Sequence, residues 1–348
     1  MHLRGGHMPD PAPSPGQVAE IDLRLLHLLQ IAPRASWSDA APIVGVSPGT
    51  LAARWSALQR DGLAWLSVYP SHARMRLTVG FIEVSVLPDR RGAFVARVCA
   101  DARVSSVDVS SGGADLLLTV IVADFAELRR LHDTLLADEL GVTRTVTRLV
   151  TEMHAEGGDW RLDSLGRAER ASAARLAGGP NDPDARPIGG EFGELVGALA
   201  LRPRASVAEL ARELGDHPAT LRRRLHRLLH SGAIRIRLDT APEVSGWPIE
   251  LSVLARVPGA AIPSVVRTLL SIPQVKLCAS LTGEANLVFS VVARQIAHLA
   301  ALERSVLQAV PELTVVETTV TMRRIKRMGH RVDAAGFATG DVTPPHWA

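Results

Sequence analysis

Residues 217–230 carry a dense run of chemically active side chains, HPATLRRRLHRLLH. At about 100° per residue, the leucines of this run fall on one face of a helix, and its arginines and histidines fall on the opposite face. Arginines on an exposed helix face can bind phosphates and guanine edges, so the run is typical of a helix that binds DNA. The alternative is the solvated basic face of an ordinary surface helix. The expected DNA contacts are His217, Thr220, Arg222, Arg223, Arg224 and Arg227.

A copy of this segment lies 170 residues earlier and lacks most of its arginines. The stretch 32–64 aligns with 202–234 without a gap, and 12 of 33 positions are identical. Ala53 and Ala57 stand where the later copy has Arg223 and Arg227. We expect this first copy either to pack against protein or to bind DNA weakly. Its expected DNA contacts are Ser47, Thr50 and Arg54.

The duplication extends over nearly the whole chain. GFIEVSVL at Gly80 is repeated as GWPIELSVL at Gly246, and SGGADLLLTVIVA at Ser111 is repeated as TGEANLVFSVVA at Thr282. A repeat of this length indicates that one structural unit occurs twice in the chain, and this duplication determines the predicted domain organisation. Each copy begins with helical periodicity and continues as strand, helix, strand, strand, helix, strand.

The helical part of each copy has the signals of a helix-turn-helix. Ser36 and Ser206 are suitable N-caps for a second helix, and Gly45 and Gly215 can adopt the left-handed conformation that ends it. A proline in the first turn then opens a third helix, the one that enters the major groove in this motif. The predicted fold class is α+β, with two tandem units, each a winged helix-turn-helix followed by a ferredoxin-like βαββαβ effector domain.

The predicted boundaries follow from these repeats and from a Gly-, Pro- and Asp-rich stretch between them. They are 1–18 for a flexible N-terminus, 19–70 for the first helix-turn-helix, 76–154 for the first ferredoxin-like domain, 155–190 for a linker with a short helix at 168–176, 191–240 for the second helix-turn-helix and main DNA reader, 246–328 for the second ferredoxin-like domain, and 329–348 for a flexible tail.

Composition excludes several classes of protein. Residues 191–333 carry 19 basic and 13 acidic groups, whereas 21–154 are neutral, so the second unit favours a polyanion. Cys99 and Cys278 cannot build a disulfide framework, and no metal-ligand spacing, phosphate loop or catalytic triad occurs. The first residues lack the apolar segment of a secretory signal, and the apolar runs are too short to span a membrane. We expect a cytoplasmic protein without catalytic residues, metal, cofactor or membrane contact.

The arrangement resembles the Lrp/AsnC family of feast/famine transcriptional regulators. The resemblance rests on IDLRLLHLLQIAPR at Ile21, on ATLRRRLHRLLHSGAI at Ala219, and on the turns SGGADL and TGEANL, which take the place of the family's GDxD turn. Both turns depart from that pattern, with Gly113 or Glu284 at its first acidic position and Asp115 or Asn286 at its second. It implies a regulator that binds double-stranded DNA, responds to an amino acid or related metabolite, and assembles as a homodimer or a larger even assembly. The turns then imply effector-binding residues, namely Ser111, Gly112, Gly113, Asp115, Thr282, Gly283, Glu284 and Asn286.

Three alternatives remain open. The two turns can be ordinary glycine-rich hairpins. A siroheme decarboxylase-like tetrapyrrole enzyme is similar in fold, with His72, Arg74 and Arg76 as its candidate residues here, although the chain has one tyrosine in all. An adaptor without DNA contact would explain the arginine-poor first copy.

Overall fold

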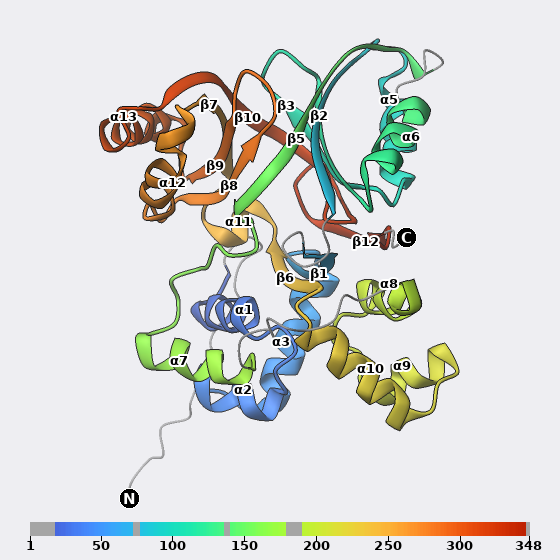
Figure 1. Cartoon of the computed structure of the whole chain (residues 1–348). Coiled ribbons are helices and arrows are strands. Elements are labelled where there is room, and N and C mark those ends of the chain that lie inside the picture. The colour runs from blue at the N-terminus through green and yellow to red at the C-terminus, as the bar shows by residue number, and fades with distance from the viewer. Residues whose placement is uncertain (1–17, 72–76, 136–139, 179–189, 346–348) are drawn as a thin grey trace, which may run out of the picture.

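The computed structural model describes residues 18–71, 77–135, 140–178 and 190–345. His72, Arg74 and Arg76 lie outside the described residues. Two bodies are stacked on each other: a helical pair below, and a strand-rich body with helices on its outside above (Figure 1). The short strands β1 and β6 lie between them (Figure 1).

The lower body consists of the two predicted helix-turn-helix domains. Ser36 and Ser206 accept hydrogen bonds from the backbone N–H of Asp39 and Glu209, which makes both serines the predicted N-caps. Gly45 and Gly215 end these helices with φ of 88° and 68°. The first domain contains α1 (Glu20–Ile31), α2 (Trp37–Val44), α3 (Pro48–Arg60) and β1 (Ala64–Pro70). The second contains α8 (Gly193–Leu201), α9 (Val207–Leu214), α10 (Pro218–His230) and β6 (Ile234–Thr240).

The two helix-turn-helix domains are joined as a pseudo-symmetric pair. Strand β1 pairs antiparallel with β6 over their whole length, from Ala64–Thr240 to Pro70–Ile234. Arg34 donates hydrogen bonds to the carbonyls of Pro203 and Ala205, and Arg204 donates to those of Pro33 and Ala35. The repeated PRAS segments therefore bind each other within one chain.

The upper body is a closed antiparallel barrel built from both ferredoxin-like domains. Its strand order is β10-β3-β4-β2-β5-β8-β9-β7, and β7 pairs back to β10. The first domain supplies β2 (Thr78–Val86), β3 (Val104–Ser110), β4 (Leu116–Val122) and β5 (Val142–Ala155), with helices α5 (Arg91–Ala100) and α6 (Phe125–Leu135). The second supplies β7 (Ile249–Arg256), β8 (Val275–Leu281), β9 (Leu287–Ala293) and β10 (Thr314–Arg327), with helices α12 (Ile262–Leu270) and α13 (Leu299–Ala309).

Two long strands close the barrel by crossing from one domain to the other. The first half of β5 pairs with β2 of its own domain, and its last residues, Val150–Ala155, pair with β8. In the same way β10 pairs first with β7 and then with β3, from Thr321 to Lys326. Closure leaves none of these eight strands with a free edge, which removes the usual template for aggregation.

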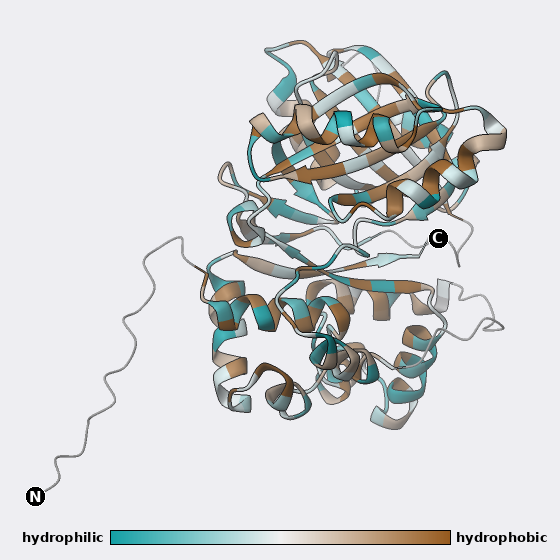
Figure 2. Cartoon of the chain, turned by 90° about the vertical axis from the view of Figure 1, so that its left-hand side faces the viewer, coloured by the Kyte–Doolittle hydropathy of each residue, from teal (hydrophilic) through white to brown (hydrophobic). Residues whose placement is uncertain are grey.

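Each domain has its own apolar core, as the repeated hydrophobic periodicity predicts. Leu25, Leu28 and Trp55 are buried in the first helix-turn-helix, and Leu195 and Leu225 are buried in the second. The barrel domains have separate clusters, one around Phe94 on α5 and one around Phe289 on β9. Hydrophobic and hydrophilic residues alternate along the helices of both bodies (Figure 2), which is typical of elements with one buried face.

Part of the predicted linker is packed against the first helix-turn-helix. Helix α7 (Arg167–Leu176) contacts α1 and α2, and its Glu169 accepts a hydrogen bond from Arg24 at 2.8 Å. Buried His27 accepts hydrogen bonds through Nδ1 from the N–H groups of Ser164 and Leu165. The predicted helix is present, and residues 159–176 are part of the first domain's structure rather than a free tether.

The prediction of a flexible tail from 329 is wrong. Strands β11 (His330–Val332) and β12 (Ala338–Val342) extend the sheet beyond β10. Ala338 donates to the carbonyl of Gly62, and Phe337 packs on the core of the first helix-turn-helix. The tail therefore fastens the barrel to the helical pair. The 3-10 turns η2 (Gly190–Phe192), η3 (Gly259–Ala261) and η4 (Ile296–His298) and helix α11 (Pro242–Ser245) complete the described elements.

Candidate nucleic-acid interface and ligand sites

Helix α10 presents arginines to solvent on the side away from its core. Leu221, Leu225 and Leu228 are buried, whereas Arg222, Arg223 and Arg227 are exposed. Both helix-turn-helix domains lie on the side of the molecule away from the barrel, so the barrel does not cover α10 (Figure 1). As predicted, α10 has its leucines on a buried face and its arginines on an exposed face.

Two of the predicted DNA contacts, Arg54 and Arg224, occupy the same position in the two copies, and a carboxylate binds each of them. Arg224 pairs with Asp216, and its guanidinium lies 5.9 Å from the Phe192 ring. Arg54 pairs with Asp22 at 3.0 Å, and Asp22 is buried. These interactions orient each third helix on its own domain, which leaves less of either arginine for a phosphate.

The remaining predicted DNA contacts lie at the start of the two third helices. His217 caps α10 and accepts a hydrogen bond from Ala219 N–H at 3.3 Å, and Thr220 accepts a long one from Arg223. Ser47 caps α3 by accepting from Thr50 N–H at 3.1 Å. These groups lie where a helix N-terminus favours an anion, but the side chains of His217 and Ser47 already serve as caps.

The two predicted effector turns lie against the long crossing strands. Ser111 exchanges hydrogen bonds with Val320 of β10, through its backbone N–H and its hydroxyl. Thr282 does the same with Leu149 of β5. Each turn therefore lies at the boundary between the two ferredoxin-like domains, and the pair follows the pseudo-symmetry of the barrel.

The polar residues that follow these turns make structural hydrogen bonds. Asp115 Oδ2 accepts from Val86 N–H at 2.9 Å, and Oδ1 is 3.9 Å from Arg91. Asn286 accepts from Val257 N–H at 2.9 Å and donates to Val257 carbonyl at 2.8 Å. Asn286 is thus fully occupied by backbone, whereas Asp115 keeps one oxygen near solvent.

The glycines of the two turns differ in how much space surrounds them. A Cβ on Gly112 would collide with Thr319 Cγ2 and Glu317 Oε1, so only glycine fits there without a shift. Gly113 has open space around it, and Gly283 has φ of 110°. Glu284 is exposed and pairs with Arg256 at 2.5 Å.

Sequence reasoning missed a charged cluster between the helical pair and the barrel. It borders a cavity of about 200 Å³ that is lined by residues of β1, β6, β7, β8, β10, the linker and the tail. Three tryptophans of the chain's six, Trp65, Trp160 and Trp247, line the same cavity. The cluster contains four cations and three carboxylates, namely Arg237, Lys276, Arg324, Arg327, Asp108, Asp239 and Glu250.

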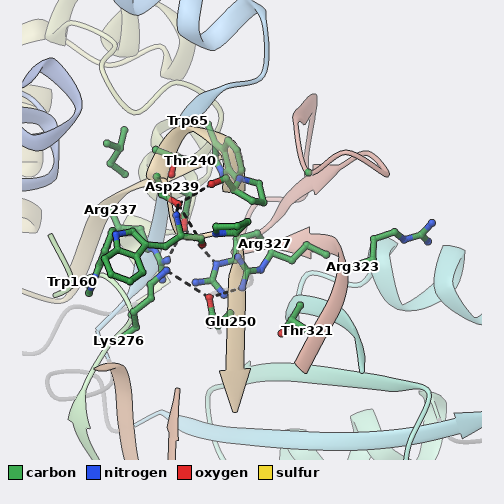
Figure 3. Close-up of a pocket in the computed structure, with 18 of the residues that line it drawn as sticks. Trp65, Trp160, Arg237, Asp239, Thr240, Glu250, Lys276, Thr321, Arg323 and Arg327 are labelled. Carbon is green, nitrogen blue, oxygen red and sulfur yellow. Dashed lines mark hydrogen bonds and ion pairs between the residues drawn. The ribbon is translucent and has the colours of Figure 1, made fainter. Parts of the chain in front are cut away.

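Two of these carboxylates are each shared by two cations. Asp239 Oδ1 lies 2.6 Å from Arg237 and 3.4 Å from Arg327. Glu250 Oε2 lies 2.6 Å from Arg324 and 3.6 Å from Lys276. The side chains of Arg237, Asp239, Glu250, Lys276 and Arg327 gather around one point between the barrel and the paired wing strands β1 and β6 (Figure 3). In contrast, Arg323 extends away from them (Figure 3).

Burial and mutual charge shift the pKa values of the cluster. Burial would raise the pKa of Glu250, but Arg324 and Lys276 hold it well below its usual value. Burial lowers the pKa of Lys276 to about 8, with Glu250 opposing the change and neighbouring arginines adding to it. Burial also raises the pKa of Asp108. The cluster therefore contains one more basic than acidic side chain.

A metal site and a membrane span are both missing from the described parts of the chain. No group of three or more His, Cys, Asp or Glu residues within them could hold a metal ion. No helix among the described residues is long and apolar enough to cross a membrane.

The full chain is similar in fold to a solved enzyme structure. Siroheme decarboxylase NirDL, in complex with an iron-uroporphyrin III analogue, matches with a TM-score of 0.58 and 17% identity, over 91% of this chain and 95% of that one. At this identity the similarity establishes the shared duplicated fold, and it carries nothing about the reaction.

Sequence relatives are regulators about half as long as this chain. The leucine-responsive regulatory protein of Haemophilus influenzae is 32% identical over 137 residues, which are 38% of this chain and 82% of that protein. An uncharacterised HTH-type transcriptional regulator of Pyrococcus abyssi is 28% identical over 144 residues, 40% of this chain and 90% of that protein.

Family models match more than half of the chain. The Lrp/AsnC ligand binding domain matches twice, at residues 79–159 and 252–330. The AsnC-type helix-turn-helix domain matches at residues 20–59. The two ligand-binding matches coincide with the two ferredoxin-like domains of the barrel. The chain therefore belongs to the Lrp/AsnC family of transcriptional regulators, in a tandem-duplicated form.

Proposed function

We propose that the chain acts in the cytoplasm as a ligand-responsive transcription regulator that binds double-stranded DNA mainly through α10. One observation carries the proposal: the exposed arginines of α10 belong to a helix-turn-helix that is rigidly paired with a second one. Arg222, Arg223 and Arg227 can reach phosphates and guanine edges, because no carboxylate of the described residues holds any of them as Asp216 holds Arg224.

The effector is proposed to be an amino acid or a related amine at the turns of the barrel. Of the two turns, the first suits an ammonium group better, because Asp115 keeps one carboxylate oxygen near solvent. Asn286 gives both of its polar atoms to Val257. The proposed effector therefore binds the first unit more tightly than the second.

The proposed assembly is a homodimer or larger even assembly of the duplicated chain. Each chain contributes one arginine-rich α10 and one α3 in which alanines take the equivalent places. Two-fold DNA half-sites match two identical reading helices, and two α10 helices require two chains. Light scattering of the purified protein at micromolar concentration tests this, and a monomer that still binds its operator would overturn it.

Footprinting of the purified protein on its own upstream DNA tests the proposed function. We expect a protected region whose binding weakens steeply between 50 and 200 mM salt, as phosphate contacts require (about 10³-fold or more for six or more contacts). Absence of any protected region, together with a shift of the absorbance band of added porphyrin when the protein is present, would overturn it in favour of a tetrapyrrole enzyme.

That second candidate, a siroheme decarboxylase-like enzyme, is favoured by the buried cations and tryptophans beneath the wing strands. Carboxylate-rich tetrapyrroles suit such walls. However, the cavity holds about 200 Å³, less than the roughly 300–1,000 Å³ typical of pockets for drug-sized ligands. A tetrapyrrole requires an opening of this joint, whereas a regulator does not, and so we propose that the chain is not an enzyme.

A further inference from the structure

Two side chains that line the cavity between the barrel and strands β1 and β6 each have an N–H group without a hydrogen-bond partner among the described residues. Trp65 and Arg237 are 5% and 9% exposed, and both line the cavity. Trp65 Nε1 and Arg237 Nε are buried without a hydrogen-bond partner among the described residues. An unpaired buried N–H costs about 1–3 kcal/mol, so a hydrogen bond to either group would stabilise this joint.

The charges of the cluster do not balance. Four cations face three carboxylates, and burial raises the pKa of one of these, Asp108. Lys276 shares its nearest carboxylate, Glu250, with Arg324, and Arg324 is 1 Å closer to it than Lys276 is. Lys276 is thus the cation with the weakest compensation in the cluster, and an added anion would be attracted to it.

Aromatic walls stand beside these cations. Lys276 Nζ lies 5.1 Å from the centre of the Trp160 ring, and in Figure 3 the two side chains lie next to each other. Trp247 lines the same cavity. Flat apolar surfaces next to unpaired donors suit a molecule with a carboxylate on a compact organic body.

The cavity also lies at the joint between the two bodies. Trp65 and Arg237 belong to the paired wings β1 and β6, and Glu250 and Lys276 belong to barrel strands. The tail turn at 334–336 forms another part of the wall. A molecule bound here touches the helical pair and the barrel at once, so its binding depends on how the two bodies meet.

We propose that this cavity is a second ligand site, separate from the turns of the barrel, that binds a small organic carboxylate and thereby sets the position of the helix-turn-helix pair on the barrel. The carboxylate is held by Lys276, beside the aromatic ring of Trp160. The anion site does not depend on the proposed function, whereas its effect on DNA rests on it.

Calorimetric titration of the full chain tests the anion site. The probes are benzoate and succinate, with neutral benzamide as the matched uncharged control and inorganic phosphate as a small anion without an organic body. We expect benzoate or succinate to bind and benzamide not to bind. Equal binding of benzamide, tighter binding of phosphate than of both carboxylates, or no binding by either carboxylate overturns the proposal.

Lysine substitutions locate the site. Lys276→Met should weaken carboxylate binding at least tenfold, about 1.4 kcal/mol. Lys326→Met is the matched control, because Lys326 is the chain's other lysine, is also buried, and donates to Asp101 carbonyl away from the cavity. We expect it to change the affinity less than twofold. Equal losses from the two variants would overturn the assignment.

Proton uptake by the wild-type chain tests the role of Lys276 even if the Lys276→Met variant does not fold. An anion beside Lys276 raises its pKa from about 8, so binding at pH 8 must take up protons. Lys276 is faced by Glu250, by Arg324 and Arg327 of β10, and by Arg237 and Asp239 of β6, all of which stay ionised at this pH. Titrations in two buffers of different ionisation enthalpy measure the uptake, and its absence would contradict the assignment.

A separate experiment measures how the bound carboxylate changes the affinity of the chain for its operator. Adding the carboxylate should change operator affinity at least threefold in the wild type and not in Lys276→Met. Carboxylate binding with unchanged operator affinity overturns the coupling. A chain that binds the carboxylate through Lys276 but binds no DNA overturns the proposed function and supports the anion site.

Discussion

Replacing Arg223 and Arg227 together with alanine should remove most of the chain's affinity for its operator. The double substitution copies onto α10 the residues that α3 already has, Ala53 and Ala57. Both arginines are exposed, so the folded structure should not depend on them.

The magnitude follows from the number of exposed cations. Helix α10 has three exposed arginines, and the double substitution leaves Arg222 alone. Each lost phosphate contact lowers the slope of log K against log salt by about 0.9, so two lower it by about 1.8. If one of the two reads a guanine edge instead, the loss of that contact costs about 1–3 kcal/mol, which is roughly 5- to 150-fold in affinity.

Fluorescence anisotropy on an operator fragment at four salt concentrations measures both quantities. The matched control is Arg54→Ala, which should leave the salt slope unchanged because Arg54 is bound to Asp22. The reverse experiment places arginines at Ala53 and Ala57, which should steepen the slope by a similar amount. An unchanged slope in the double alanine variant, or an equal loss from Arg54→Ala, would refute the asymmetry between the two units.

Three further predictions concern the joints of the molecule. Burial lowers the pKa of His27 to about 4 while its unfolded value is near 6.5, so stability falls as the pH drops from about 6.5 to 4. In urea unfolding, His27→Gln should therefore shrink the stability difference between pH 7 and pH 4.5 by about 2–3 kcal/mol, and an unchanged difference would contradict this. Arg204→Ala should cost about 2–3 kcal/mol, because it removes two charge-assisted hydrogen bonds and a contact 3.8 Å above the Trp37 ring. Arg202→Ala, which removes only a surface pair, should cost less than about 1 kcal/mol, and equal costs would count against the contact between the PRAS segments. Asp115→Asn should change stability by less than about 0.5 kcal/mol, because the equivalent residue is already asparagine, but should weaken any bound amine by about 1.5–3 kcal/mol in a thermal-shift titration. Unchanged amine binding would leave the ordinary hairpin interpretation standing.

Local signals were sufficient to predict most of the secondary structure. Ser206, Gly215 and Pro218 mark helix ends by their own backbone and capping chemistry, and the structure has those ends at the predicted places. The tail was missed because β11 and β12 are short, and residues such as Gly336 and Gly340 interrupt any alternation of apolar side chains. These strands form because β10 and the first helix-turn-helix provide partners, which local sequence does not reveal.

The charged cluster was missed for a related reason. Its members come from positions as distant as Asp108 and Arg327, and each one alone reads as a polar residue of a half-exposed strand. A signal was present in the alternation of IRIRL at Ile234, which puts Arg235 and Arg237 on the same face of a strand, and in the run RRIKR at Arg323. That face is turned inward only because β6 pairs with β1 between the barrel and the helical pair.

Fusion of the two units changes how the protein can evolve. In an assembly of identical subunits every substitution occurs on both sides of the symmetry axis, whereas here α3 and α10 can mutate independently. The pairing of β1 with β6 is intramolecular, so dilution does not dissolve it and subunits of other family members cannot exchange into it. One half can therefore drift toward a purely architectural role while the other keeps its sequence, and the pairing between the two halves stays within one chain.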